Sequence, residues 1–187
     1  MKEINSALVP HEFEELQKYI MGHEIPWYHY EHLTYPPTLP EFNENHDKKR
    51  IEETKKLFSK GMTKEQQMYS HYMCHIVYIN DKINSEFVFQ KLKPLIDLIN
   101  PITLIRIKIN NYPQTPTVIH HQDHVDGNYK HKGALFYVNT NNGATVIENK
   151  EVASVENKLV LFDSSKPHHS TTTSDSNRRI TININYF

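Results

Sequence analysis

The spacing of apolar residues changes near residue 101, from a helical period before it to a period of two after it. Residues 11–21 carry apolar side chains three or four positions apart, which predicts a helix with one buried face. Residues 84–99 repeat this pattern, and Pro94 within them predicts a kink or an early end of the helix. Residues 71–79 combine aromatic and β-branched side chains and predict a strand.

Two further segments of this first half are marked by proline and by charge. Residues 35–47 contain three prolines and predict a loop. Residues 48–60 are rich in charge and are followed by Gly61, a pattern typical of a short surface helix and its C-terminal end. The first hundred residues are therefore expected to be a mainly helical support with one or two strands.

From residue 101 onward, apolar and polar residues alternate as they do in strands with two different faces. In the two longest runs isoleucine occupies every second position, at Ile105, Ile107 and Ile109 and at Ile180, Ile182 and Ile184. Shorter apolar runs at 134–138 and 158–162 lie between them, with Asn- and Gly-containing turns such as 139–143. Several short strands at this spacing predict a sandwich or barrel, and hence an α+β, mainly β fold class.

The composition predicts one soluble domain over residues 1–187, with helical support in 1–100 and a β-core in 101–187. The 21 Lys and Arg residues nearly balance the 22 Asp and Glu residues, so no overall charge favours nucleic acid. No segment has the apolar length of a membrane helix or the pattern of a secretion signal. The single cysteine, Cys74, excludes an internal disulfide and fits a reducing compartment, so a cytoplasmic location is expected.

Two overlapping His-x-Asp pairs follow the first isoleucine-rich strand: His121 with Asp123, and His124 with Asp126. Residues i and i+2 of an extended chain point to the same side, so either pair can direct both side chains at one metal ion. Imidazole combined with carboxylate suits Fe(II) or Mn(II). Such pairs also occur in histidine-rich surface loops, so a pair alone does not define a metal site.

Two histidines and two arginines further along the chain can complete such a site. His168 and His169 follow an apolar strand and a turn, and either can add the second imidazole to a set that leaves one side of the metal open. Arg178 and Arg179 stand at the start of the last strand. A guanidinium can hold a dicarboxylate through two parallel hydrogen bonds. The competing interpretation is a solvated loop histidine and a charged strand end.

The order of these motifs over residues 104–187 resembles the 2-oxoglutarate- and Fe(II)-dependent oxygenases, specifically the prolyl-4-hydroxylase-like branch and the small oxygenases of bacteriophages. The motifs that carry the resemblance are NYP, HVD, ALFYVN, LVLFD, PHHSTT and R-x-x-x-N-x-N-Y-F. The resemblance implies a double-stranded β-helix, the cupin-type jelly roll, with the N-terminal half as supporting helices. An ordered set of motifs is more specific than any single one.

The resemblance assigns His124 and Asp126 as the first two metal ligands. HVD followed by Gly127 matches the family pair better than His121 and Asp123 do, although this earlier pair remains the alternative. The later pair also lies at about the family's distance from the NYP motif.

The same resemblance assigns His168 as the third ligand, because it directly follows Pro167 in the turn. His169 remains the alternative, and only one of the two can bind the metal because neighbours on an extended strand point in opposite directions. Arg179 matches the family residue that pairs with the distal carboxylate of 2-oxoglutarate. Arg178 competes with it, but Arg179 shares the polar face of the last strand, which we expect to line the barrel interior.

Four residues near this site have two interpretations each. Tyr112 and Tyr137 match family tyrosines that face the co-substrate, and aromatic core packing is an equally common role for them. Arg106 and Lys108 could attract an anionic substrate, while the more ordinary interpretation is the exposed face of a strand. We expect substrate selection in the loops at 36–47 and 127–132.

The resemblance implies an enzyme that uses Fe(II), 2-oxoglutarate and O2, with ascorbate as an optional reductant. It would hydroxylate a C–H bond of a peptidyl side chain or small molecule and release succinate and CO2. The carboxylate ligand Asp126 argues against a halogenase, in which that position must be vacated. Two other classes stay open: a non-catalytic cupin-like sensor that binds metal or ligand, and a jelly-roll interaction protein. The sequence defines neither the substrate nor the oligomeric state.

Overall fold

Two antiparallel sheets dominate the structure, a computed structural model that describes residues 1–31, 33, 61–127 and 129–187. The large sheet has the strand order β1-β9-β6-β11-β5-β3-β2, with β4 paired to β3, and the small sheet has the order β10-β7-β8. The strands are β1 (Lys2–Ile4), β2 (Tyr28–Tyr30), β3 (Tyr72–Ile79), β4 (Lys82–Ile83), β5 (Leu104–Pro113), β6 (Lys132–Tyr137), β7 (Ala144–Ile147), β8 (Lys150–Ala153), β9 (Lys158–Asp163), β10 (His168–Ser170) and β11 (Arg178–Tyr186). The predicted loop 35–47 and helix 48–60 lie outside the described residues.

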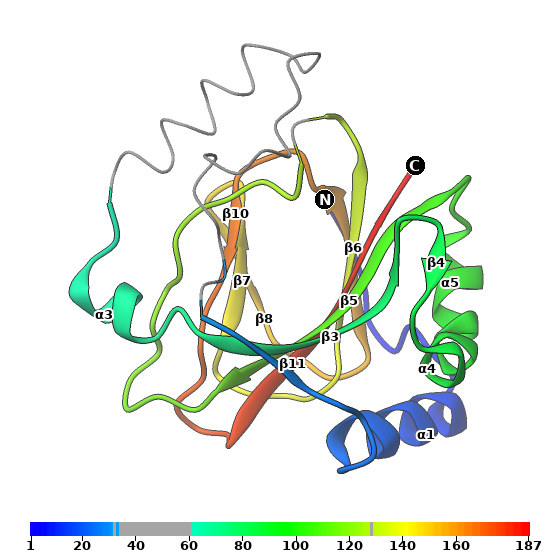
Figure 1. Ribbon diagram of the computed structural model, residues 1–187, viewed down its shortest axis with the longest axis horizontal. Helices are drawn as coiled ribbons and strands as arrows, with labels where there is room; N and C mark the ends of the chain where they lie inside the picture. The colour runs from blue at the N-terminus through cyan, green and yellow to red at the C-terminus, as the bar shows by residue number, and fades with distance from the viewer. Residues whose placement is uncertain (32, 34–60, 128) are drawn as a thin grey trace.

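The helices are α1 (Pro10–Met21), α3 (Lys64–Met68), α4 (Glu86–Lys91) and α5 (Lys93–Ile99). Figure 1 shows α1, α4 and α5 together on one side of the large sheet, with β7, β8 and β10 on the other. The predicted helix at 11–21 is confirmed as α1. The prediction of a kink or an early end near Pro94 is confirmed as an interruption: the helical segment breaks at Leu92 and resumes as α5, with Pro94 in its first turn, where a missing amide hydrogen costs little.

The hydrophobic core lies between the large sheet and these helices. The isoleucines of β11 and two from β5 are fully buried there, and they pack in one cluster with the apolar faces of α1 and α5: Phe13, Leu16, Ile20, Leu95, Ile107, Ile109, Ile180, Ile182 and Ile184. A register shift near the end of the β5–β11 pair changes the alternation, so Leu104 rather than Ile105 packs against this cluster. Apart from Ile105, the isoleucine rows face the helices, which agrees with the prediction that the polar face of the last strand lines the barrel interior.

The opposite face of the same strands is polar and points into the space between the two sheets. Paired residues on β5 and β11 form a ladder of inward side chains: Tyr112 with Arg179, Asn110 with Thr181, Lys108 with Asn183, and Arg106 with Asn185. A barrel that contains a ligand site reverses the usual arrangement, with polar groups inside and apolar groups under the helices.

The N-terminal half contributes more strand than the sequence pattern predicts. Four strands, β1 to β4, lie within the described part of residues 1–100, and all belong to the large sheet. β3 pairs with β5 over most of its length, so the strand predicted at 71–79 is confirmed as an integral part of the barrel wall. No helix in the described ranges is long and apolar enough to cross a membrane.

Candidate metal centre

A backbone bridge places the side chains of His124 and His168 next to each other. The two residues exchange hydrogen bonds between their amide nitrogens and carbonyl oxygens, each 2.9 Å long. Asp126 is attached nearby, because its amide donates to the carbonyl oxygen of Ser164 at 3.2 Å. Since alternate residues of an extended chain share a side, His124 and Asp126 both face His168.

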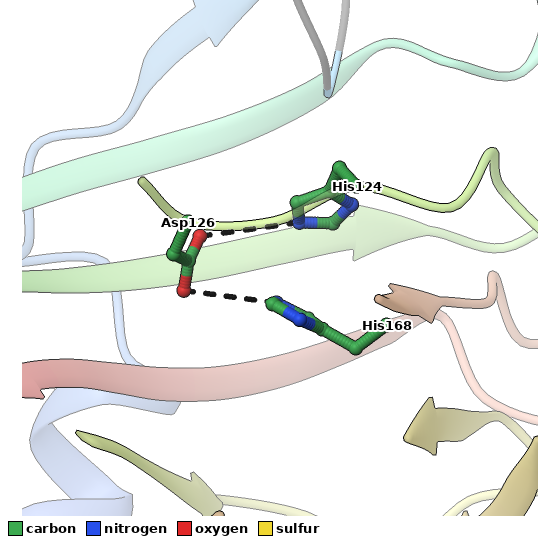
Figure 2. Close-up of side chains that lie close together, drawn as sticks. All are labelled: His124, Asp126 and His168. Carbon is green, nitrogen blue, oxygen red and sulfur yellow. Dashed lines mark ion pairs between the residues drawn. The ribbon is translucent and has the colours of Figure 1, made fainter. Parts of the chain in front are cut away.

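These three side chains point toward one another (Figure 2). Nε2 of His124 lies 4.0 Å from Oδ1 of Asp126, and Nε2 of His168 lies 3.7 Å from Oδ2. One ligand atom from each residue lies within 4.8 Å of the other two. Ligand bonds of about 2.1 Å place two ligand atoms of one ion roughly 3–4 Å apart. The cluster therefore has the spacing that a single metal ion can bridge.

The two imidazole rings are held with Nε2 toward the shared centre. Nδ1 of His168 donates to the carbonyl oxygen of Lys166 at 2.8 Å, and Nδ1 of His124 makes a longer contact of 3.4 Å with that of Gln122. A hydrogen bond at Nδ1 leaves the lone pair on Nε2, which is the arrangement of a metal ligand. Nε2 of His168 is buried and has no hydrogen-bond partner among the described residues, a costly state that a metal ion would relieve.

Asp126 is fixed by four side-chain hydrogen bonds. Arg106 donates to Oδ1 at 3.0 Å, while Ser164 at 2.7 Å and both Asn183 and Asn185 at 3.0 Å donate to Oδ2. Burial opposes ionisation of the carboxyl group, but the Arg106 guanidinium and the surrounding donors outweigh it and hold the pKa of Asp126 well below its usual value. Asp126 is therefore an anion with little freedom to rotate.

The electrostatics also keep His124 neutral. Burial lowers the pKa of His124 to about 3, and repulsion from His168 whenever that ring is protonated adds to this shift, although the charge of Asp126 opposes it. A neutral imidazole beside an ionised carboxylate is the protonation state that metal binding requires.

The alternative pair does not reach this centre. Nδ1 of His121 lies 2.9 Å from Oγ of Ser170, and the carboxylate of Asp123 lies 2.6 Å from Nδ1 of His169. His169 also contacts His120, at 3.1 Å, so it belongs to a separate surface group. The structure thus brings together His124, Asp126 and His168 and leaves the three alternative ligands, His121, Asp123 and His169, elsewhere.

Arg179 lies at the other end of the inward polar row and is fully buried. Its Nε donates to Oγ of Ser154 and its Nη2 to Oγ1 of Thr145, both at 2.7 Å, and Nη1 makes a longer contact of 3.4 Å with the carbonyl oxygen of Thr171. A Cβ atom at Gly143 would lie 2.6 Å from Cδ of Arg179, so only glycine allows this approach. In the described part of the chain, none of its hydrogen-bond partners is a carboxylate, although a buried guanidinium without a counter-ion is costly.

Tyr112 and Tyr137 border the same guanidinium. Their ring centres lie 5.1 Å and 5.7 Å from Cζ of Arg179. Both rings also pack in apolar clusters, Tyr112 beside Tyr72 and Cys74, so the core-packing interpretation applies, and their role toward a co-substrate stays a prediction. Arg178 instead donates to the carbonyl oxygen of Met21 at the end of α1, on the helical side of the sheet.

Unpaired polar atoms line the strands between Arg179 and the three ligand residues. Oδ1 of Asn110, Oγ1 of Thr181 and Oδ1 of Asn183 are buried without a hydrogen-bond partner among the described residues. Such atoms are rare in a closed core and are expected where a polar molecule binds. The residues present therefore suit a metal ion at one end and a dicarboxylate that reaches Arg179 at the other.

The residues that support this centre were mostly missed by sequence reasoning. Arg106 was expected on the exposed face of a strand or as an attraction for substrate, yet it pairs with Asp126 inside the barrel. Arg106 lies an even number of positions from Asn110 and Tyr112 on β5, so all three side chains point to the same face of the strand. This spacing could have identified Arg106 as an inward residue. Ser164 and Thr145 lie in segments with no alternation, so no sequence signal marked them.

No protein-family model matches this chain, and no curated protein matches it in sequence. Solved structures do match. A viral collagen prolyl hydroxylase from Paramecium bursaria Chlorella virus 1, in complex with 2-oxoglutarate, is 11% identical, with a TM-score of 0.50 over 100% of this chain and 96% of its own. HygX from Streptomyces hygroscopicus, with nickel and 2-oxoglutarate bound, is 9% identical, with a TM-score of 0.52 over 98% and 81%. SnoN, a non-haem α-ketoglutarate-dependent epimerase of nogalamycin biosynthesis, is 9% identical, with a TM-score of 0.57 over 99% and 76%.

At these identities the likeness establishes the fold. The chain is a double-stranded β-helix protein, and the jelly-roll core predicted from the sequence is confirmed. Its cluster of two histidines and one carboxylate lies between the sheets of that core and has the residue types of a facial triad. The resemblance to the 2-oxoglutarate- and Fe(II)-dependent oxygenases is thus supported at the level of the fold.

Proposed function

We propose that this protein is an Fe(II)- and 2-oxoglutarate-dependent dioxygenase that hydroxylates a C–H bond of a peptidyl side chain or a small molecule. His124, Asp126 and His168 hold the metal, and Arg179 binds the distal carboxylate of 2-oxoglutarate. One observation carries the proposal. On the inner face of one barrel, His168 of the triad has a buried Nε2 and Arg179 has a buried guanidinium; among the described residues the first has no hydrogen-bond partner and the second has no carboxylate partner.

Bound Fe(II) and 2-oxoglutarate would supply the oxidising chemistry, in which one oxygen atom of O2 enters the substrate, the other enters succinate, and CO2 is released. The protein residues position these partners. Backbone carbonyls orient both imidazoles, and four donors fix both oxygens of Asp126. Arg179 lies four residues from Asn183 on β11, about 13 Å at roughly 3.3 Å per residue. A dicarboxylate bound at the metal would lie between these two ends of the inward polar row.

The structural neighbours support this proposal through their fold and their bound molecules. The viral collagen prolyl hydroxylase is in complex with 2-oxoglutarate, and HygX has nickel and 2-oxoglutarate bound. The first of these motivates a peptidyl prolyl side chain as one candidate substrate. A free amino acid or another small metabolite is the competing candidate.

The test is an anaerobic titration of metal-free protein with Fe(II) and 2-oxoglutarate, followed by the weak visible charge-transfer absorption of the chelate. We expect this band in the wild type and in His121→Ala, and we expect its loss in His124→Ala. Metal binding without a band, or a band that survives His124→Ala, would refute the proposed site. Binding of both partners without succinate formation in the presence of O2 would leave the non-catalytic sensor as the function.

A further inference from the structure

Lys108 is a cation inside the barrel that the proposed reaction does not use. It lies opposite Asn183 in the β5–β11 register, and Asn183 donates to Asp126. The backbone of Lys108 is therefore at the level of the three ligand residues. Its Nζ donates to the hydroxyl oxygen of Tyr72 at 2.8 Å and lies 4.9 Å from the centre of that ring.

Lys108 differs from the other inward cations in its partners. Arg106 pairs with Asp126 at 3.0 Å, and Arg179 is assigned to 2-oxoglutarate. Within the described ranges, no carboxylate lies within 4.0 Å of Nζ of Lys108. Burial, and next the charge of Arg106, lower the pKa of this ammonium group to about 8, so it is mainly charged at pH 7. A charge kept in this position without a counter-ion is a destabilising feature that a bound anion would offset.

The donor geometry indicates which anion fits. Tyr72 accepts a hydrogen bond from Lys108, so its own hydroxyl hydrogen is free to donate, and no acceptor for it is found in the described part of the chain. The ammonium group has further hydrogens as well. Two donors on atoms 2.8 Å apart match the two oxygens of one carboxylate, with one positive charge for one negative charge.

We propose that Lys108 and Tyr72 bind a carboxylate group of the primary substrate, which is therefore a carboxylic acid such as a free amino acid or a peptide C-terminus. This inference rests on the proposed function, because it takes the triad as the place of oxidation. The two carboxylates of 2-oxoglutarate already have partners in that site, Arg179 for one and the metal ion for the other. The carboxylate at Lys108 is thus left for the molecule that is oxidised.

The test compares acids with their neutral amides as probes, by calorimetry on protein loaded anaerobically with Fe(II) and 2-oxoglutarate and on metal-free protein. The probes are N-acetyl-L-proline with its amide, benzoate with benzamide, and inorganic phosphate. We expect wild type to prefer an acid over its amide by at least about tenfold, the strength of one charge-assisted pair. Lys108→Met should abolish this preference, and Tyr72→Phe should reduce it. Lys82→Met, which removes an exposed lysine on β4, should retain it.

The remaining outcomes separate this inference from the proposed function. If the wild type shows no acid preference in either pair, or if phosphate binds more tightly than both acids, the Lys108 proposal is wrong. It is also wrong if Lys108→Met weakens 2-oxoglutarate itself about tenfold, because Lys108 would then serve the co-substrate. If the wild type binds no 2-oxoglutarate, the proposed function fails, while a Lys108-dependent acid preference in metal-free protein still supports an acid site.

Discussion

Single residues inside the barrel show which parts of the site a sequence can reveal. On β11, Arg178 and Arg179 can be told apart because neighbouring residues of a strand point to opposite faces of the sheet. In the structure Arg178 points to the side of the helices and Arg179 to the inside of the barrel. The alternation of faces does not decide between His168 and His169, because the sequence of a short strand does not show which of its faces points inward. That choice depends on the backbone bridge to His124, a contact between segments more than forty residues apart.

Replacement of Arg179 by methionine tests the assigned partner of 2-oxoglutarate. We expect Arg179→Met to weaken 2-oxoglutarate at least about a hundredfold, because it removes a buried bidentate donor, and to leave metal affinity nearly unchanged. Arg178→Met is the matched control and should bind 2-oxoglutarate like the wild type. Calorimetric titration first with Mn(II), and then with 2-oxoglutarate in the presence of Mn(II), measures the dissociation constants of the metal and of 2-oxoglutarate. Equal losses of 2-oxoglutarate affinity in the two variants would contradict the assignment.

Lys108 should make the stability of the protein depend on alkaline pH. Its pKa is about 8 in the folded chain and 10.5 as the reference value, so the unfolded chain takes up the proton first as the pH falls. Stability is therefore lost as the pH falls from 10.5 to 8, by at most about 3 kcal/mol. Lys108→Met should lack this loss. Urea unfolding at pH 7.5 and pH 10 measures it, and an identical pH dependence in both proteins would disprove the explanation.

At the scale of elements, the predictions succeeded where one periodicity continues undisturbed. α1 and the helix break before Pro94 followed from apolar spacing and from the chemistry of proline. Strands of two to four residues, such as β1, β4 and β8, carry too few positions to show an alternation. They form because the neighbouring strand supplies hydrogen-bond partners, as β9 does for β1, and this information lies elsewhere in the chain.

Helix α5 should stabilise the sheet through one face only. Leu95 is fully buried against the large sheet, whereas Leu98 on the same helix is 45% exposed. We expect Leu95→Ala to lower the free energy of unfolding by about 2–5 kcal/mol, because it leaves a cavity. Leu98→Ala should change it by less than about 0.5 kcal/mol. Chemical denaturation measures the free energy of unfolding of both variants. Comparable losses of this free energy in the two variants would show that α5 does not pack through the Leu95 face alone.

For the whole molecule, the fold class could be predicted because ordered motifs and alternating strands agree. Of the candidate site, the sequence predicted the three clustered residues His124, Asp126 and His168 but not the donors that support them, because these come from β5, β11 and the segment after β9. Such donors are selected by spatial proximity, and a single sequence does not show which polar residues become neighbours.

Ligand binding should stabilise the entire chain, because the site joins strands from both sheets. With Mn(II) and 2-oxoglutarate each at about 100 times its dissociation constant, each ligand adds about 2.7 kcal/mol. For a chain of this size, one such ligand raises the melting temperature by roughly 5–10 °C. We expect this rise in the wild type and its loss in Asp126→Ala. A thermal melt with and without ligands measures it, and an unchanged rise in the variant would place the metal elsewhere.

The two faces of β11 have a consequence for how this protein can change. The isoleucine face supports folding, while the polar face, four side chains from Arg179 to Asn185, serves the site. Substitutions on one face therefore leave the other face's role largely untouched. The same holds for the inward face of β5, where Lys108 lies opposite Asn183. A library of variants at inward positions beside the triad, Lys108 first among them, should keep a high fraction of folded members and sample new substrate preferences. The same alternation offers a route by which related chains diverge in chemistry at constant architecture.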